Sequence, residues 1–144
     1  MPTSTEPSTD AAREAWGLIW RMFMQDKPRR WAILSKLGLS MQQSMALTNL
    51  QPGEPLPMSS LAELLHCDNS NVTGIVDRLE AAGLAERRPG LHDRRVKTIA
   101  LTDAGERLRA EVMRRAGEPP PPLAALAPTD AAALRDILER ALAG

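Results

Sequence analysis

The chain has 144 residues, of which 43% are apolar, and its 18 basic and 18 acidic residues give a formal net charge of zero. This composition suits one globular domain and excludes a uniformly basic or disordered chain. The single cysteine excludes an intrachain disulfide framework and a cysteine-rich metal site. No apolar run approaches the roughly 18–20 residues of a membrane span. Residues 1–6 also lack a signal pattern, so we expect a cytoplasmic protein with no membrane partner.

The N-terminal part of the chain predicts two helices. Residues 1–8 are rich in Pro, Ser and Thr and are expected to be disordered. From Ser8 or Thr9 onward, apolar residues recur with the period of a helix, at Ala12, Trp16, Ile19, Trp20 and Phe23. Pro28 suits the first turn of a second helix that ends before Gly38 and carries Trp31, Leu34 and Leu37. Residues 9–38 are therefore assigned to N-terminal helices that serve dimerisation.

The middle of the chain begins with a capping box. Residues 40–43 read Ser-Met-Gln-Gln, which predicts the start of a third helix with three inward residues, Ala46, Leu47 and Leu50. After a turn rich in Pro and Gly, residues 56–58 are long enough only for a strand fragment. Ser59 or Ser60 then begins a short helix, whose expected apolar side holds Leu61, Ala62, Leu64 and Leu65.

A further helix follows the break at Cys67. Asp68 is a good N-cap residue, Gly83 ends the helix, and its apolar stripe consists of Val72, Ile75, Val76 and Leu79. Residues 84–88 and 96–101 then alternate as two strands, with a polar turn between them. Short helix, turn, second helix and hairpin together predict a winged helix-turn-helix over residues 39–103, in which the second helix is the recognition helix.

The C-terminal part predicts two more helices that serve dimerisation, over residues 104–144. Thr102 and Asp103 cap the first, whose apolar positions are Ala104, Leu108 and Val112. Gly117 and Pro119–Pro122 stop it, so residues 117–128 are expected to form a proline-rich linker. The last helix starts near Thr129 and has a wide apolar stripe of Leu134, Ile137, Leu138, Ala141 and Leu142. Packing of the terminal helices onto the chain's own middle helices would satisfy much of the same pattern.

The outer face of the recognition helix carries small or hydrogen-bonding side chains. Such a face allows close approach to base edges in a major groove, and the free N–H groups of the first helical turn favour a phosphate. Gly74 costs about 1 kcal/mol relative to Ala inside a helix, which indicates close approach to a partner. The candidate DNA-binding residues are Asn69, Ser70, Asn71, Thr73, Gly74, Asp77 and Arg78. The alternative is an ordinary surface helix whose Asn and Ser residues only cap it.

The hairpin concentrates positive charge. Residues 86–97 carry five basic and two acidic side chains, a net charge of +3, so the rest of the chain carries −3. Such a patch is the electrostatic pattern of phosphate binding. The candidate residues are Arg87, Arg88, Asp93, Arg94, Arg95 and Lys97, with Asp93 expected to hold one guanidinium in place. The alternative is a solvated charged turn.

Residues 40–105 resemble the winged helix-turn-helix of MarR-type transcriptional regulators. The matching segments are Leu61-Ala62-Glu63-Leu64-Leu65, Asn71 to Glu80 with Gly83-Leu84, Asp93-Arg94-Arg95, and Leu101-Thr102-Asp103-Ala104-Gly105. Together these segments are fairly specific, although each alone is weak.

The resemblance implies a mainly α fold with a small β-hairpin wing (α+β), and a homodimer with interleaved N- and C-terminal helices. It also implies binding of double-stranded DNA at a pseudo-palindromic operator, usually as a repressor that a small ligand or an oxidant releases. Carried over by position, the major-groove residues are Ser70, Asn71, Thr73 and Arg78, and the minor-groove residues are Arg94 and Arg95. The chain departs from the family where Pro119–Pro122 shorten the helix after Gly105.

Other signals are weaker. A small aromatic effector is a candidate partner, with a candidate pocket at Trp16, Trp20, Trp31 and Met41, although tryptophans at helical spacing usually belong to a core. Cys67 is expected to be a small buried apolar residue and not a redox sensor, and His66, Cys67 and His92 do not predict a metal site. With no phosphate loop or nucleophile motif, neither an enzyme nor a cofactor is expected. The alternative function is a winged-helix module that binds protein and lacks DNA affinity.

Overall fold

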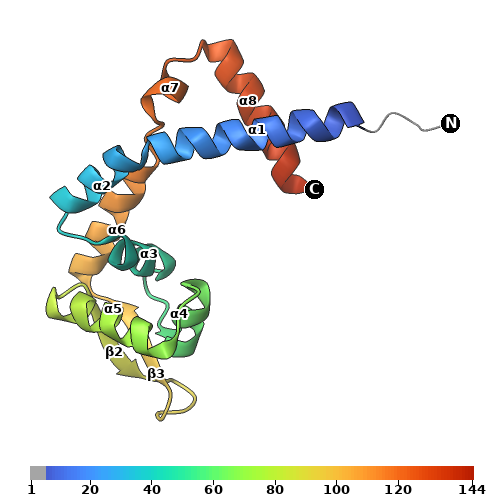
Figure 1. The fold of residues 1–144 in the computed structure, drawn as a ribbon. Helices are drawn as coiled ribbons and strands as arrows, with labels where there is room; N and C mark the ends of the chain where they lie inside the picture. Colours follow the sequence, from blue (N-terminus) through green and yellow to red (C-terminus); the bar gives the residue numbers. More distant parts are fainter. Residues whose placement is uncertain (1–5) are drawn as a thin grey trace.

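The computed structural model of the chain describes residues 6–144, with side chains from Asp10 onward (Figure 1). Eight helices and three strands occur in this part of the chain: α1 (Glu6–Gln25), α2 (Lys27–Lys36), α3 (Met41–Asn49), β1 (Leu56–Pro57), α4 (Met58–Leu64), α5 (Asn69–Ala81), β2 (Ala85–Pro89), β3 (Lys97–Leu101), α6 (Asp103–Ala116), α7 (Pro121–Ala124) and α8 (Pro128–Ala143). The expected fold class is confirmed. The expected disorder of residues 1–8 is wrong for residues 6–8, because α1 begins at Glu6; residues 1–5 lie outside the described chain.

Three of the predicted helix starts are confirmed by their caps. Ser40 accepts a hydrogen bond from the backbone N–H of Gln43, whose side chain accepts one from the backbone N–H of Ser40, so the capping box is complete. Asp68 caps α5 and Thr102 caps α6 in the same way, each accepting from a backbone N–H three residues later. Such caps satisfy N–H groups that have no partner inside the helix. Local sequence therefore sets where these helices begin.

The hairpin is part of a three-stranded antiparallel sheet in the order β1-β3-β2. Ala85 pairs with Leu101, and Leu56 pairs with Ile99 on the other side of β3. The predicted strand fragment therefore becomes a third strand that covers one edge of β3. Because β3 is the central strand, four of its five residues are buried, and this gives the hairpin a fixed base.

The core lies between α3, α4, α5, α6 and the sheet. Its largest fully buried side chains come from α3, α4, α5 and β3 and are Leu47, Leu50, Leu61, Val72, Val76, Leu79 and Ile99, and α6 adds the buried Val112. One expectation is wrong: Leu64, which the sequence places on the apolar side of α4, is 48% exposed. The core thus holds the recognition helix α5 against the sheet by its apolar face.

The terminal helices extend away from this core. Figure 1 shows α1, α7 and α8 at the end of the molecule opposite the loop between β2 and β3. No residue of α8 is buried, and the apolar residues Trp16, Trp20, Phe23 and Ile137 are each more than half exposed. The predicted linker at 117–128 contains a short helix, α7, in which Pro121 and Pro122 occupy the first turn, where proline is compatible with a helix. Among the described helices, none is long and apolar enough to cross a membrane.

Candidate nucleic-acid interface

The outer face of α5 is open to solvent. Its predicted contact residues Asn69, Ser70, Asn71, Thr73, Asp77 and Arg78 are exposed, and Gly74 is half-buried. The opposite face is buried in the core through Val72, Ile75, Val76 and Leu79. The helical period alone therefore divides α5 into a core side and a solvent side, as the sequence predicts.

The first turn of α5 is organised by Asp68. One carboxylate oxygen of Asp68 accepts hydrogen bonds from the backbone N–H of Asn71 at 2.9 Å and from the hydroxyl of Ser70 at 2.8 Å. These two bonds, the backbone one first, hold the pKa of Asp68 below its ordinary value. A DNA phosphate bound at this turn, as the sequence predicts, would therefore meet the negative carboxylate of Asp68 and the backbone N–H of Asn71, which already donates a hydrogen bond.

Thr73 and Gly74 lie in the middle of the exposed face. The Thr73 hydroxyl donates a hydrogen bond to the backbone carbonyl of Asn69 at 2.8 Å, so its proton is used within the helix. A Cβ atom placed on Gly74 would meet nothing within 4 Å. Gly74 is therefore not required by the packing of this chain.

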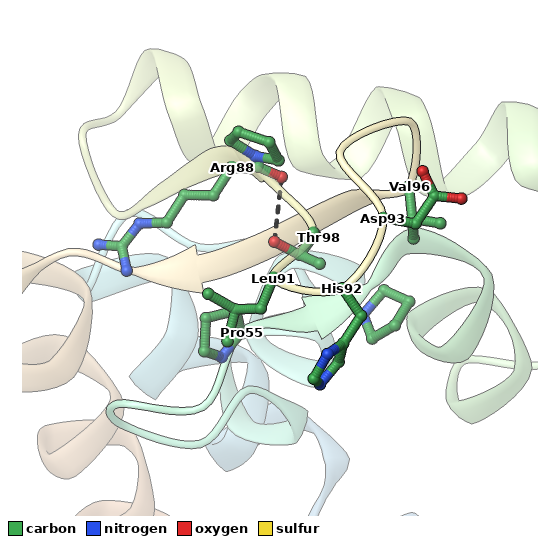
Figure 2. A pocket seen from close by; sticks show the side chains of 10 residues that line it. Pro55, Arg88, Leu91, His92, Asp93, Val96 and Thr98 are labelled. Atoms are coloured by element: carbon green, nitrogen blue, oxygen red, sulfur yellow. Dashed lines mark hydrogen bonds between the residues drawn. The ribbon is translucent and has the colours of Figure 1, made fainter.

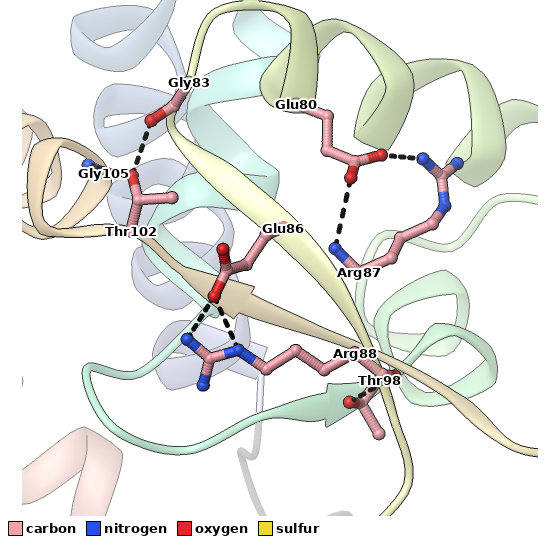
Figure 3. Close-up of polar contacts among 8 residues, drawn as sticks. All are labelled: Glu80, Gly83, Glu86, Arg87, Arg88, Thr98, Thr102 and Gly105. Carbon is pink, nitrogen blue, oxygen red and sulfur yellow. Dashed lines mark hydrogen bonds and ion pairs between the residues drawn. The ribbon is translucent and has the colours of Figure 1, made fainter. Parts of the chain in front are cut away.

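Two acidic residues of α5 face β2. Nη2 of Arg87 lies 2.6 Å from Oδ1 of Asp77. Nη1 of the same guanidinium pairs with Glu80, as Figure 3 shows. The hydrogen bond with Asp77, followed by that with Glu80, raises the pKa of Arg87. The sequence predicts that Asp77 and Arg87 both face DNA; the structure joins them to each other. Glu80 is not among the predicted residues, although its spacing of three residues from Asp77 places both carboxylates on one side of a helix.

Arg88 points to the other face of β2. Its guanidinium pairs with Glu86, two residues earlier on the same strand, with Nε 2.7 Å from Oε1 (Figure 3). Arg87 and Arg88, two of the five predicted cations, are thus paired inside the domain. In the described chain, Arg78, Arg94, Arg95 and Lys97 make no ion pair, and all four are exposed. The wing therefore keeps three exposed cations without an ion pair, and α5 keeps one.

The loop of the wing is a defined turn. The backbone N–H of Gly90 donates to the carbonyl of Val96 at 2.8 Å, and the N–H of Val96 donates to the carbonyl of Asp93 at 3.1 Å. The Asp93 carboxylate accepts a hydrogen bond from the backbone N–H of Arg95 at 2.9 Å. The expectation that Asp93 holds a guanidinium is therefore wrong. Asp93 instead shapes the loop that presents Arg94 and Arg95.

A pocket of about 360 Å³ lies beneath this loop, where β1 meets the wing (Figure 2). Its walls are mostly apolar and come from two distant segments, with Pro55, Pro57, Pro89, Leu91 and Val96 among them. The hydroxyl of Thr98 donates to the carbonyl of Arg88 at 3.0 Å at its edge. The sequence did not predict this pocket, because β1 reaches the wing only by pairing with β3.

The residues proposed for an effector pocket do not meet in one place. Trp16 and Trp20 lie on α1 with ring centroids 6.4 Å apart, whereas Trp31 lies on α2 with Nζ of Lys27 5.6 Å from its ring centroid. Met41 lines a separate cavity of about 120 Å³, together with Arg30, Ile33, Leu34, Ser44, Val112 and Ala116.

Arg30 stands between that cavity and a second one of about 320 Å³ at the junction of α1, α2 and α6. Its guanidinium lies over the Phe23 ring, 3.6 Å from the centroid, and Nη2 donates to the Phe23 carbonyl at 2.9 Å. Nε of Arg30 is buried and has no hydrogen-bond partner in the described chain. Sequence reasoning missed Arg30, because nothing in its neighbourhood in the sequence distinguishes it from a surface arginine.

Cys67 is half-buried at the edge of the core, between exposed His66 and exposed Asp68, and is therefore less buried than expected. Over residues 6–144, no group of three or more His, Cys, Asp or Glu side chains is arranged to hold a metal ion.

Comparisons with known proteins agree with this geometry. Residues 39–97 match the model of the MarR family. In Bacillus subtilis (strain 168), the uncharacterized HTH-type transcriptional regulator YfiV is 31% identical over 96 residues, which cover 67% of this chain and 60% of that protein. The HTH-type transcriptional repressor MdtR of the same organism is 33% identical over 92 residues, which cover 64% and 59%. The chain thus matches about 60% of the length of these curated relatives.

The fold extends the similarity over most of the chain. The solved structure of a MarR family protein from Bacillus stearothermophilus has a TM-score of 0.77 and 25% identity, with 92% of this chain and 93% of that chain covered. Because the family model covers the helix-turn-helix and the wing, and the solved structure also covers most of the terminal helices, the chain belongs to the MarR family of winged helix-turn-helix proteins.

Proposed function

We propose that the protein is a transcription regulator that binds double-stranded DNA, with α5 in a major groove and the loop of the wing in the adjacent minor groove. The observation that carries this proposal is that four exposed cations of the recognition helix and the wing make no ion pair in the described chain: Arg78 on α5, and Arg94, Arg95 and Lys97 on the wing. Arginine side chains fit phosphate oxygens and narrow minor grooves. The polar, uncrowded face of α5 supplies side chains that can read base edges.

The proposed active form is a homodimer. The apolar faces of α1 and α8 are exposed in the single chain, and solvent contact of such faces is costly. A second copy of the chain would cover them, and a two-fold axis would place two copies of α5 in successive major grooves. The expected operator is therefore a pseudo-palindrome with half-sites about one helical turn apart.

The proposed regulatory effect is repression that a small molecule relieves. One relative, MdtR, is named a repressor, and in this chain two cavities meet where the terminal helices join the DNA-binding part. The unpartnered Nε of Arg30 and the apolar walls around it suit a small aromatic acid. Such a ligand would act by changing how α1 and α2 sit against α6.

The test is a salt titration of DNA binding. Fluorescence anisotropy measures the affinity for a 30-base-pair duplex that the wild-type protein enriches from a random library, and for an unrelated duplex. If a dimer makes roughly 6–10 phosphate contacts, the affinity falls about 10³–10⁵-fold between 50 and 200 mM salt. Arg94→Gln weakens binding to both duplexes and lowers the salt slope by about one unit for each phosphate that the arginine binds in the wild-type complex.

The matched control is Arg140→Gln on α8, an exposed arginine at the other end of the molecule, which leaves the salt slope unchanged. Absence of binding at 50 mM salt, or an affinity that does not depend on salt, contradicts the DNA-binding proposal and favours a protein-binding module. Footprinting that finds one unrepeated half-site contradicts the dimer alone.

A further inference from the structure

Arg87 connects the wing to the recognition helix. It is the third residue of β2, and its guanidinium reaches back across the turn at 82–84 to two carboxylates of α5, those of Asp77 and Glu80. Figure 3 shows the contact with Glu80. The backbone N–H of Arg87 also donates to the second carboxylate oxygen of Glu80, at 3.3 Å. Side chain and backbone of one residue therefore bind the same helix.

We infer that Arg87 is a positioning residue for DNA binding: it braces the wing against α5 and neutralises Asp77, and it does not itself contact DNA. This inference rests on the proposed function, and it changes the role of two residues that the sequence placed on the DNA. The wing binds fewer phosphates than its five cations suggest, because Arg87 is used internally.

The position of Arg87 explains why a brace is useful. The turn after α5 and the buried Ala85 hold the start of β2 against the helix, whereas the end of the strand, at Arg88 and Pro89, is exposed and lies outside the core. The contact between Arg87 and Asp77 lies farther along both elements and spans ten residues of sequence. A guanidinium presents a rigid fork of donors that suits two carboxylates at once. The brace therefore sets the angle between the recognition helix and the loop that carries Arg94 and Arg95.

Electrostatics disfavours the opposite arrangement, in which Arg87 turns outward to a phosphate. Asp77 and Glu80 lie one helical turn apart, and the Asp77 side chain is 60% exposed on the same surface as the predicted DNA contacts. Without Arg87, both carboxylates would be unneutralised beside the DNA backbone and would repel each other as well. With Arg87 in place, the negative charge of Asp77 is already neutralised in the free protein.

The experiment compares three variants of the full chain on the enriched duplex: Arg87→Gln, Asp77→Asn and the double variant. Arg87→Gln is expected to bind about tenfold more weakly or worse, because a wing without its brace must be ordered when its other cations bind the DNA, and because Asp77 is left unneutralised. Adding Asp77→Asn restores part of that affinity, because it removes the unneutralised carboxylate. The double variant has the wild-type net charge, so its salt slope is a clean measure of the number of phosphates bound and is expected to equal the wild-type slope.

Two results would overturn the inference while leaving the proposed function intact. The first is a double variant whose salt slope is lower by about one unit, as expected if Arg87 binds a phosphate directly; the second is a failure of Asp77→Asn to restore any affinity. Arg87→Lys serves if Arg87→Gln does not fold. Lysine keeps the positive charge but cannot bind two carboxylates at once. If Arg87 braces the wing, Arg87→Lys therefore binds DNA more weakly, with the wild-type salt slope. If Arg87 binds a phosphate directly, Arg87→Lys keeps the wild-type affinity. Failure of the wild-type chain to bind either duplex refutes the proposed function, and the inference with it.

Discussion

The hydroxyl of Thr73 donates a hydrogen bond to the carbonyl oxygen of Asn69, one turn earlier in α5, at 2.8 Å. The donor of this side chain is therefore used inside the helix, and its methyl group and its oxygen lone pairs are left for a partner. A threonine methyl can contact the methyl group of thymine in a major groove, and the oxygen can accept from an exocyclic amine. Thr73 is thus a candidate reader of base identity that does not need to donate.

We predict that Thr73→Ala weakens binding to the enriched duplex by about 1–3 kcal/mol and changes binding to unrelated DNA little. Thr73→Ser keeps the hydroxyl and its internal hydrogen bond and removes the methyl group, so it tells which of the two matters. Circular dichroism establishes first that both variants are folded. An equal loss on both duplexes would mean that Thr73 supports the helix and does not read bases.

Gly74→Ala is expected to separate stability from DNA binding. Because nothing lies within 4 Å of a Cβ at this position, alanine is tolerated and raises the free energy of unfolding by about 1 kcal/mol through its higher helix propensity. The same methyl group projects toward the surface that approaches DNA, so the affinity for the enriched duplex falls. Thermal unfolding and anisotropy measure the two effects.

Gly17→Ala is the matched control, since Gly17 is also inside a helix with nothing within 4 Å. It is expected to stabilise the chain without changing DNA affinity. A Gly74→Ala variant with unchanged affinity would show that DNA does not approach this part of α5 closely.

Gly105→Ala has the opposite effect on stability. A Cβ at Gly105 would overlap the backbone carbonyl oxygen of Leu84, at the point where the first turn of α6 passes the start of the sheet. Backbone cannot move aside as a flexible side chain can, so overpacking here destabilises the fold by about 1–3 kcal/mol or more. Urea unfolding measures the change, and an unaltered midpoint would contradict this close approach.

The dimer is tested on α8. Ile137 is 53% exposed on the apolar face of that helix, so Ile137→Asp places a charge in the proposed interface. A central interface residue contributes more than about 1 kcal/mol, and the dissociation constant of the dimer is expected to rise about tenfold or more. Leu91→Asp, at a leucine that is 91% exposed on the wing, is the control for the same kind of change. Sedimentation equilibrium measures the dissociation constant of the dimer for each variant. Equal values for the two variants would show that α8 is not part of the dimer interface.

The cap of the recognition helix gives stability a pH dependence. Hydrogen bonds from Asn71 and Ser70 hold the pKa of Asp68 below its ordinary value of 3.8. The folded state therefore binds this proton less readily than the unfolded state does. The cap stabilises the fold fully above pH 3.8, and this contribution is lost as the pH falls through the lowered pKa.

Asp68→Asn keeps a good N-cap residue that does not titrate. We therefore expect the free energy of unfolding of the wild-type chain to fall more steeply with acid, below pH 3.8, than that of the variant. Glu111, whose pKa is lowered to about 2 by hydrogen bonds from Arg114 and then Arg115, contributes equally to both proteins and cancels in the comparison. Parallel stability curves would show that Asp68 does not cap α5.

The sequence by itself determined most of the local structure. The capping box at Ser40, the cap at Asp68 and the apolar stripe from Val72 to Leu79 depend on residues three or four positions apart, and each appears as predicted. Helical periodicity and capping are properties of a single element, so they can be recognised before the fold is known. The division of α5 into a buried side and a solvent-facing side follows from the same arithmetic.

The tertiary structure decided which charged residues remain free. Arg87 and Arg94 look alike in the sequence, as cations of one basic hairpin. The fold places Arg87 beside Asp77 and Glu80, whereas Arg94 lies on the exposed loop. Likewise, Leu56 and Pro57 join the sheet only through β3, and Arg30 meets its cavities only through α6. Such pairings join segments far apart in the sequence. They depend on how whole elements pack, and no local pattern of residues records which side chains will meet.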